Sequence, residues 1–284
     1  MTSENTRARV ALVTGCGKAD GMGQAVARTL AAAGVTVVVS DLKPSGVPNV
    51  GQETRVVGIG WNGVETLVAQ ICEAGGRASA VLGDISDEAD AERMVAEAAA
   101  FGGGLDILVN NAAAPQGADR NDISDFGTAT WNTVLDINLR GTYLMSRFAV
   151  AQMRQNHYGR IVNIASMAGI DALPHATAYS ASKAGVLGFT RALATDVGAW
   201  GITVNAVCPG VVWTSRAGMF EGTASDEEQL KAARGRVIPV GRVGHPDDIA
   251  AAVAFFASEG AGYITAQALP VDGGGISAFP LPQP

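Results

Sequence analysis

A tyrosine and a lysine one helical turn apart are the first residues whose spacing indicates chemistry. Tyr179 and Lys183 are four positions apart in a helical pattern, so their side chains share one face of the helix. A free phenol ionises near pH ~10, too high for a base at neutral pH, but a neighbouring ammonium favours the phenolate. The pair is a candidate acid/base that takes a proton from an alcohol or returns one to a ketone. Spacing alone more often marks a solvated surface pair, so this interpretation depends on the surrounding residues.

A glycine-rich loop lies much earlier, at Thr14–Gly23, between an apolar run and a helical pattern. Glycines allow the backbone to approach a pyrophosphate, and the helix offers unpaired N–H groups. Such a loop is weak evidence by itself, because sharp turns also use glycine. Asp41 ends the next apolar run, where a carboxylate accepts hydrogen bonds from adenine ribose hydroxyls and repels a 2′-phosphate. Together they predict an NAD site, although Lys18 inside the loop is a candidate partner for a phosphate.

Short apolar runs rich in Val and Ile alternate with longer Ala-rich helical patterns, which is typical of βαβ units around a parallel sheet. The expected strands are Val10–Thr14, Val35–Asp41, Ala78–Leu82, Ile107–Asn110, Arg160–Ile164, Thr203–Cys208 and Gln267–Val271. The expected helices are Gly21–Ala33, Gly63–Ala74, Glu88–Ala100, Thr130–Met153, Ala178–Gly198 and Pro246–Ala257. Right-handed crossovers place helices on both faces of such a sheet. We therefore predict an α/β, single-domain doubly wound fold over residues 1–284, with a seven-stranded parallel sheet.

Two segments lack either pattern. Residues 43–62 are rich in Pro and Gly and are expected to form a loop insertion after the second strand. Residues 215–240 mix Gly, charges and short apolar pieces. Because long ordered loops are often functional, we expect this segment to be a substrate lid.

Several motifs, in order along essentially the whole chain, resemble those of the short-chain dehydrogenase/reductase family. They are Thr14–Gly23, Asp84-Ile85, Asn110-Asn111-Ala112-Ala113, Asn138, Ser166, Tyr179 with Lys183, Pro209–Thr214, and Val271-Asp272-Gly273-Gly274. The resemblance implies a Rossmann fold and an oxidoreductase that moves a hydride between a nicotinamide and a carbon bearing an alcohol or ketone oxygen.

The resemblance also implies residue roles. The catalytic residues would be Asn138, Ser166, Tyr179 and Lys183. Ser166 would hydrogen-bond the substrate oxygen, and Asn138 would hold a water that links Lys183 to solvent. The cofactor contacts would be Gly15, Gly21, Met22, Gly23, Asp41, Asp84, Ile85, Asn110, Ala112, Tyr179, Lys183, Pro209, Gly210, Val212 and Thr214.

Two departures from the family pattern bear on these roles. The glycine loop is two residues longer than usual, which leaves open which of Cys16, Gly17 and Lys18 contacts phosphate. Ala113 stands where the family has a glycine. A methyl group is tolerated there if the backbone keeps φ below zero.

Composition excludes several other classes. A formal charge of −7 with scattered Lys and Arg gives no footprint for nucleic acid or anionic membranes. The polar N-terminus and its short first apolar run predict neither a signal sequence nor a membrane span, so we expect a cytoplasmic protein. Cys16, Cys72 and Cys208 lack paired spacing, which predicts neither disulfides nor a metal site.

Two alternative functions stay open at this stage. One is an NADP-linked ketoreductase of acyl-chain synthesis. Asp41 is the feature that discriminates between this function and an NAD-dependent one. The other is a non-catalytic NAD-binding regulatory protein, against which the intact Asn138, Ser166, Tyr179 and Lys183 argue.

The substrate is expected to be an apolar, ring-containing secondary alcohol or its ketone. The side chains expected near the nicotinamide are Pro115, Met167, Leu173, Trp213, Met219 and Phe220, while Arg216 would instead favour an acidic substrate. The family resemblance further suggests a homotetramer, assembled through the helices around Thr130–Met153 and Ala178–Gly198.

Overall fold

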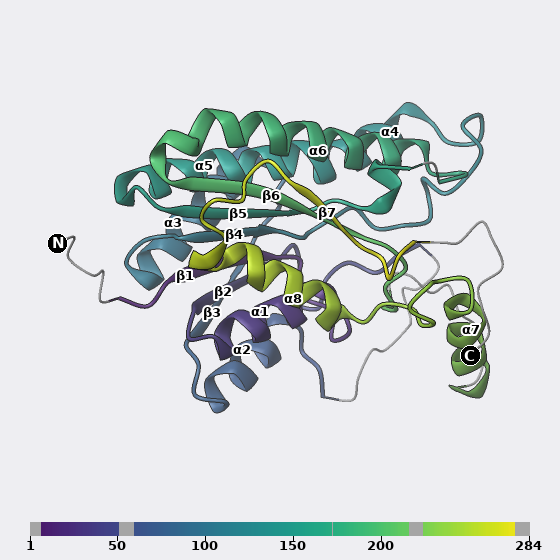
Figure 1. The fold of residues 1–284 in the computed structure, drawn as a ribbon, viewed down its shortest axis with the longest axis horizontal. Coiled ribbons are helices and arrows are strands. Elements are labelled where there is room, and N and C mark those ends of the chain that lie inside the picture. Colours follow the sequence, from purple (N-terminus) through teal and green to yellow (C-terminus); the bar gives the residue numbers. More distant parts are fainter. Residues whose placement is uncertain (1–6, 51–59, 172, 216–223, 276–284) are drawn as a thin grey trace.

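The computed structural model describes residues 7–50, 60–171, 173–215 and 224–275, and a single parallel sheet forms its centre (Figure 1). The strands are β1 Val10–Thr14, β2 Thr36–Asp41, β3 Ala78–Leu82, β4 Ile107–Asn110, β5 Gly159–Ile164, β6 Ile202–Pro209 and β7 Ala268–Val271. Their order is β3-β2-β1-β4-β5-β6-β7, and every neighbouring pair is parallel. Strand order reverses between β1 and β4, so the crevice at their carboxyl ends is the expected ligand site. The predicted doubly wound α/β fold is confirmed.

Helices cover both faces of the sheet (Figure 1). They are α1 Met22–Ala32, α2 Val64–Glu73, α3 Glu88–Gly102, α4 Thr128–Leu135, α5 Gly141–Asn156, α6 Thr177–Val197, α7 Ala224–Gly235 and α8 Pro246–Ala257. Buried side chains of α1, α2 and α8 pack on one face, and those of α3, α5 and α6 pack on the other. Within the described residues, all seven strands belong to one sheet.

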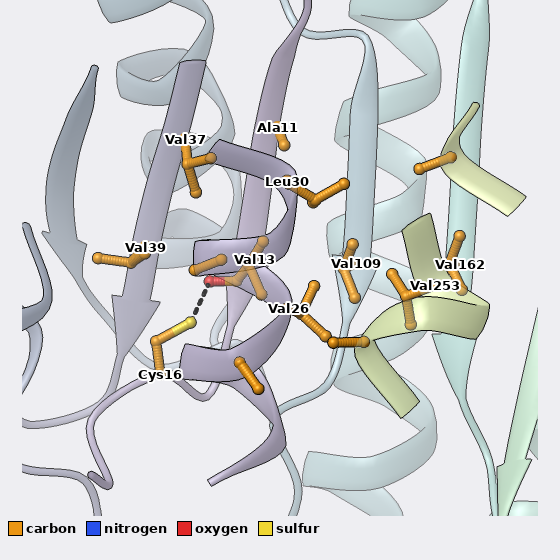
Figure 2. Close-up of a cluster of buried hydrophobic side chains, with 14 of the residues drawn as sticks. Ala11, Val13, Cys16, Val26, Leu30, Val37, Val39, Val109, Val162 and Val253 are labelled. Atoms are coloured by element: carbon orange, nitrogen blue, oxygen red, sulfur yellow. Dashed lines mark hydrogen bonds between the residues drawn. The ribbon is translucent and has the colours of Figure 1, made fainter. Parts of the chain in front are cut away.

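Alternation along β1 shows how the strands serve two cores at once. Ala11 and Val13 pack into the cluster under α1 and α8, whereas Val10 and Leu12 pack into the cluster under α3 and α5. Successive strand side chains point to opposite faces, and a strand buried on both must be apolar throughout. Figure 2 shows the first cluster, where Val13 meets side chains from α1 and the neighbouring strands.

One predicted helix is not a continuous α-helix. The expected helix Thr130–Met153 is divided into α4 and α5 by a π turn, Asp136–Arg140. The hydrophobic period continues through the break, so the sequence pattern does not reveal the extra residue of a π turn.

Another helix was missed. The segment 215–240 was predicted to be irregular, yet α7 forms within it. Its sequence has few apolar residues, so no amphipathic period marked it. Acidic residues at its start and Lys231, which lies 3.2 Å from Glu227 and 2.8 Å from Glu228, stabilise it instead. Residues 216–223 of the predicted lid, and 51–59 of the predicted insertion, lie outside the described residues.

Candidate active site

The glycine loop follows β1 at the switch point of the sheet. Gly15 has φ +74°, and a Cβ added there would stand 2.8 Å from Cα of Ala112. A Cβ on Gly23 would stand 2.3 Å from the carbonyl oxygen of Gly15. Both positions therefore require glycine for close backbone packing.

The N-terminus of α1 opens at the same place. Gly21 caps this helix without a side-chain hydrogen bond, and the first turn carries no acidic residue. The first backbone N–H groups of α1, at the positive end of the helix dipole, are therefore available to bind an anion. Gly21 and Met22 line a cavity at this point. This arrangement fits the pyrophosphate of a dinucleotide.

Asp41 ends β2 beside this loop. One carboxylate oxygen accepts the N–H of Gly17 at 2.8 Å, and the other accepts the N–H of Leu42 at 2.8 Å. Burial raises the pKa of the Asp41 carboxyl, and these N–H groups and Lys18 offset part of that effect. Asp41 and Lys18 both line the cavity.

The structure distinguishes Cys16, Gly17 and Lys18, the three loop residues whose contact with phosphate the sequence left open. Cys16 is buried, and its thiol donates to the carbonyl oxygen of Val13 at 3.3 Å (Figure 2). Burial raises the pKa of this thiol far above its ordinary value, so it stays protonated. The Gly17 N–H donates a hydrogen bond to the Asp41 carboxylate. Of the three, Lys18 is the one that lines the cavity.

Asn111 and Thr14 join the loops after β1 and β4. The Asn111 amide donates to the carbonyl oxygens of Thr14 at 2.8 Å and of Gly15 at 3.0 Å. The Thr14 hydroxyl accepts the N–H groups of Asn111 and Ala112, each at 3.0 Å. Neither residue was assigned a role from sequence, although both lie within the quoted motifs. They hold the two sides of the switch point together.

Ten of the predicted cofactor residues line this one cavity at the carboxyl ends of the strands. They are Gly15, Gly21, Met22, Asp41, Asp84, Ile85, Ala112, Tyr179, Lys183 and Thr214. The cavity thus runs from the end of β3, past the glycine loop, to the first turns of α6.

Tyr179 and Lys183 lie in the first two turns of α6. The Lys183 ammonium is buried, donates to the carbonyl oxygen of Ile164 at 2.7 Å, and lies 5.8 Å from the centre of the Tyr179 ring. Tyr179 is half-buried. The predicted neighbouring phenol and ammonium are therefore present in one cavity.

Asn138 and Ser166 flank this pair without lining the cavity. Asn138 is buried in the π turn; its amide donates to the Ser182 hydroxyl at 2.9 Å, and its side-chain oxygen accepts the Ala114 N–H at 2.8 Å. Ser182 in turn donates to the carbonyl oxygen of Tyr179 at 2.7 Å. The Ser166 hydroxyl accepts the Ala168 N–H at 3.1 Å, directly after the cavity residue Ala165.

Five predicted cofactor residues lie away from the cavity surface, namely Gly23, Asn110, Pro209, Gly210 and Val212. The Asn110 amide is instead buried, where it donates to Ser146 at 3.0 Å and to Asn163 at 2.8 Å. A Cβ on Gly210 would stand 2.6 Å from Cβ of Asp272, so this glycine serves packing against the chain after β7.

The expected apolar substrate wall is only partly assembled. Pro115 lines the cavity, but Leu173 is exposed and Met167 packs against a core cluster. Trp213 lines a second cavity, where its ring N–H donates to Glu227 at 2.7 Å. Met219, Phe220 and Arg216 lie outside the described residues.

The backbone geometry tests one smaller expectation, the tolerance of a methyl group at Ala113. Ala113 is not among the described residues with positive φ, so its methyl group is tolerated as expected. Among the described residues no cluster of His, Cys, Asp or Glu is arranged to hold a metal ion. Within the same residues, no helix combines the length and apolar character that a membrane span requires.

Two polar residues at this end of the sheet carried no signal in the sequence. Arg120 lies over the ring of Tyr179, with its guanidinium carbon 4.1 Å from the ring centre. Asp20, in the lengthened part of the glycine loop, accepts the Ser215 N–H at 2.5 Å and the Ser215 hydroxyl at 2.8 Å. Both contacts join segments far apart in the chain, which a single sequence does not reveal.

Comparison with known proteins agrees with this geometry. The family model described as Enoyl-(Acyl carrier protein) reductase matches residues 15–275. The chain is 36% identical over 269 residues to "(2S)-[(R)-hydroxy(phenyl)methyl]succinyl-CoA dehydrogenase subunit BbsD" of Thauera aromatica, covering 94% of this chain and 96% of that one. It is 35% identical over 266 residues to cis-4-hydroxycyclohexanecarboxylate dehydrogenase of Sinomonas cyclohexanicum, covering 94% and 96% of the two chains.

A solved structure gives the same result for the fold. The crystal structure of an actinorhodin polyketide ketoreductase with NADPH has a TM-score of 0.79 and 34% identity, over 96% of this chain and 98% of that one. Sequence, family model and fold agree over nearly the full length. The chain belongs to the short-chain dehydrogenase/reductase family, whose members are oxidoreductases of alcohols and ketones that bind a nicotinamide cofactor.

Proposed function

We propose that this protein is an NAD(H)-dependent oxidoreductase that interconverts a secondary alcohol and its ketone, with Tyr179 as the acid/base. The observation that carries the proposal is that Asp41, Tyr179 and Lys183 line one cavity. When bound there, the nicotinamide supplies or accepts the hydride. The test is a change in nicotinamide absorbance when the purified protein is mixed with NAD and a panel of secondary alcohols.

In this proposal each catalytic side chain has one task. Tyr179 takes the alcohol proton or returns it to the ketone oxygen. Lys183, buried and held by the carbonyl oxygen of Ile164, places a positive charge beside that phenol. Ser166 donates a hydrogen bond to the substrate oxygen. Asn138 fixes the start of α6 through Ser182, and in this proposal it holds a water that links Lys183 to solvent.

Cofactor choice is assigned to Asp41. In this proposal its carboxylate accepts the ribose hydroxyls of NAD and repels a 2′-phosphate through like charge. Lys18 in the same cavity supports the second candidate, an NADP-linked ketoreductase, and one structural relative is a ketoreductase with NADPH. A comparison of kcat/KM for the two cofactors separates these candidates. Equal use of both would assign the dominant role to Lys18.

The proposed substrate class is an apolar, ring-containing secondary alcohol or its ketone. Pro115, Ile137 and Ala165 give the cavity apolar walls near Tyr179. The names of two relatives describe a phenyl-bearing hydroxy compound and a hydroxycyclohexane. Both names also describe acids or acyl thioesters, so the panel should pair each cyclic alcohol with its carboxylated analogue. A requirement for the carboxylate would overturn the apolar assignment.

We further propose a homotetramer assembled through α4, α5 and α6. Tyr143 on α5 is partly exposed and meets Phe189 of α6 edge-to-face, with ring centres 6.4 Å apart. A partly exposed aromatic pair across two neighbouring helices is suited to a subunit interface. Light scattering coupled to size exclusion measures the assembly directly, and a monomer at micromolar concentration would contradict it.

A further inference from the structure

The segment Leu42–Val50, here called the strap, leaves the end of β2 and contacts the segments that follow β4 and β6. The Asn49 side-chain oxygen accepts the N–H of Gln116 at 3.1 Å, and the Val50 N–H donates to the carbonyl oxygen of Gln116 at 3.0 Å. The Asn49 amide also donates to the carbonyl oxygen of Ser215 at 3.4 Å. Gln116 follows β4 and Ser215 follows β6. The strap therefore joins the end of β2 to the chain segments that follow β4 and β6, at the carboxyl ends of the strands.

Ser215 is held from a second direction. Asp20 in the glycine loop accepts both the N–H and the hydroxyl of this serine. Asn49 and Ser215 are 2% and 7% exposed, although both are polar and lie in loops. A hydrogen-bonded polar junction at this depth is stable as a unit and costly to leave unpaired. The strap, the glycine loop and the chain after β6 therefore meet at one buried point.

The first half of the strap lies directly on the glycine loop. A Cβ on Gly17 would stand 2.2 Å from the backbone nitrogen of Gly46, so the two backbones are in contact. Trp61 fastens the same loop by donating its ring N–H to the carbonyl oxygen of Gly17 at 2.7 Å. Gly46 and Val47 line the cavity from the strap side. The cavity that fits the dinucleotide is thus bounded by the strap as well as by the sheet edge.

We propose that the strap closes the dinucleotide site, and that the cofactor enters and leaves only after Asn49 and Asp20 release Ser215. Asn49 and Asp20 are then positioning residues for the segment Thr214–Ser215. The inference rests on the proposed cofactor function and adds that cofactor exchange is slow compared with that of an open cleft. It follows from the hydrogen bonds of Ser215 to Asn49 and Asp20, because none of the three segments can separate without breaking this junction.

The rate of NADH release tests this directly. The purified protein is loaded with NADH and mixed in a stopped-flow instrument with excess ADP-ribose, and the loss of bound NADH fluorescence gives the dissociation rate constant. Asn49→Ala removes two of the tethers and should raise this rate constant about 25-fold, since each net hydrogen bond of about 1 kcal/mol changes an equilibrium about fivefold. Asp20→Asn should raise it by a smaller factor, and it serves where Asn49→Ala does not fold.

A matched control is available in the same chain. Asn205 is also buried, donates to the carbonyl oxygen of Ile264 at 2.8 Å and accepts the N–H of Gln267 at 3.1 Å, but it does not line the cavity. Asn205→Ala should lower thermal stability without changing NADH release. Equal NADH dissociation rate constants for wild type, Asn49→Ala and Asp20→Asn would overturn the proposed role of the strap. An increase in Asn205→Ala as large as that in Asn49→Ala would also overturn it. Failure of the wild type to bind either NADH or NADPH would instead overturn the proposed function, and the strap with it.

Discussion

Arg120 is stacked on the ring of Tyr179, with its guanidinium carbon 4.1 Å from the ring centre. The nearest carboxylate oxygen, on Asp119, is 3.9 Å from the Arg120 side chain, too far for a hydrogen bond. Among the described residues, the buried Nη1 of Arg120 has no hydrogen-bond partner. The flat face of the tyrosine is therefore the principal contact that orients this guanidinium, and the guanidinium in turn limits rotation of the ring.

Arg120→Met should reduce kcat about fivefold with little change in KM for NADH, because it removes the cation that packs on Tyr179, an interaction worth roughly 1 kcal/mol. Steady-state kinetics with a fixed alcohol measures the effect. Arg191→Met, on an exposed position of α6, is the control. An unchanged kcat in Arg120→Met would show that ring orientation does not depend on the stack.

Tyr179→Phe should lower kcat by about 10²–10⁴-fold, because it removes the proton-transfer group and little else. NADH binding, measured by fluorescence titration, should stay close to that of the wild type. Lys183→Ala should weaken both turnover and binding, since it removes a buried charge that lines the same cavity. If Tyr179→Phe kept more than about a tenth of kcat, another group would have to move the proton.

The preference for NAD over NADP should fall as pH is lowered. Burial raises the pKa of the Asp41 carboxyl, so its negative charge is lost at a higher pH than that of an exposed aspartate. The charge repels a 2′-phosphate, and protonation removes that repulsion. The ratio of kcat/KM for NAD to kcat/KM for NADP should therefore rise with pH across the acidic range.

Asp41→Asn supplies the control for this titration. It should give a low ratio that does not vary with pH, because the amide carries no charge to lose. A wild-type ratio that is also flat in the acidic range would assign the discrimination to a group other than Asp41.

The first turn of α8 offers a test of stability away from the site. His245 and Asp248 form a capping box, in which the Asp248 carboxylate accepts the His245 N–H at 2.7 Å. Asp248→Ala should cost about 1 kcal/mol of unfolding free energy, measured by urea denaturation. Asp247→Ala, which leaves that bond intact, should cost less.

The same aspartate adds a pH dependence. The Arg242 guanidinium lowers the pKa of Asp248 to about 2. A lowered carboxyl pKa gives stability that is complete above the unfolded value and is lost as pH falls through the folded one. The extra stability of the wild type over Asp248→Ala should therefore shrink between about pH 4 and pH 2. The loss is small, because the pair is partly exposed.

Sequence patterns predicted the strands well because both faces of this sheet are covered. Val10–Thr14 is apolar at almost every position, and β1 has those bounds. They failed at α7, where ion pairs such as Lys231 with Glu228 replace an apolar face. The motifs placed Tyr179 and Lys183 correctly in one cavity, since neighbours within a helix are fixed by its period. Arg120 and Asn49 could not be found in this way, because their partners come from other loops.

The π turn Asp136–Arg140 fixes the number of residues between α4 and α5. A π turn contains one residue more than the α-helical path needs. Deleting one residue there would restore regular α-helical winding and leave α5 in nearly its present rotation relative to α4, because the wide turn absorbs the extra residue. Leu144 and Met145 would stay buried against the sheet, whereas Asn138, buried inside the turn, would lose its position. A single-codon deletion within Asp136–Arg140 should therefore disturb the surroundings of Asn138 more than the packing of α5 on the sheet.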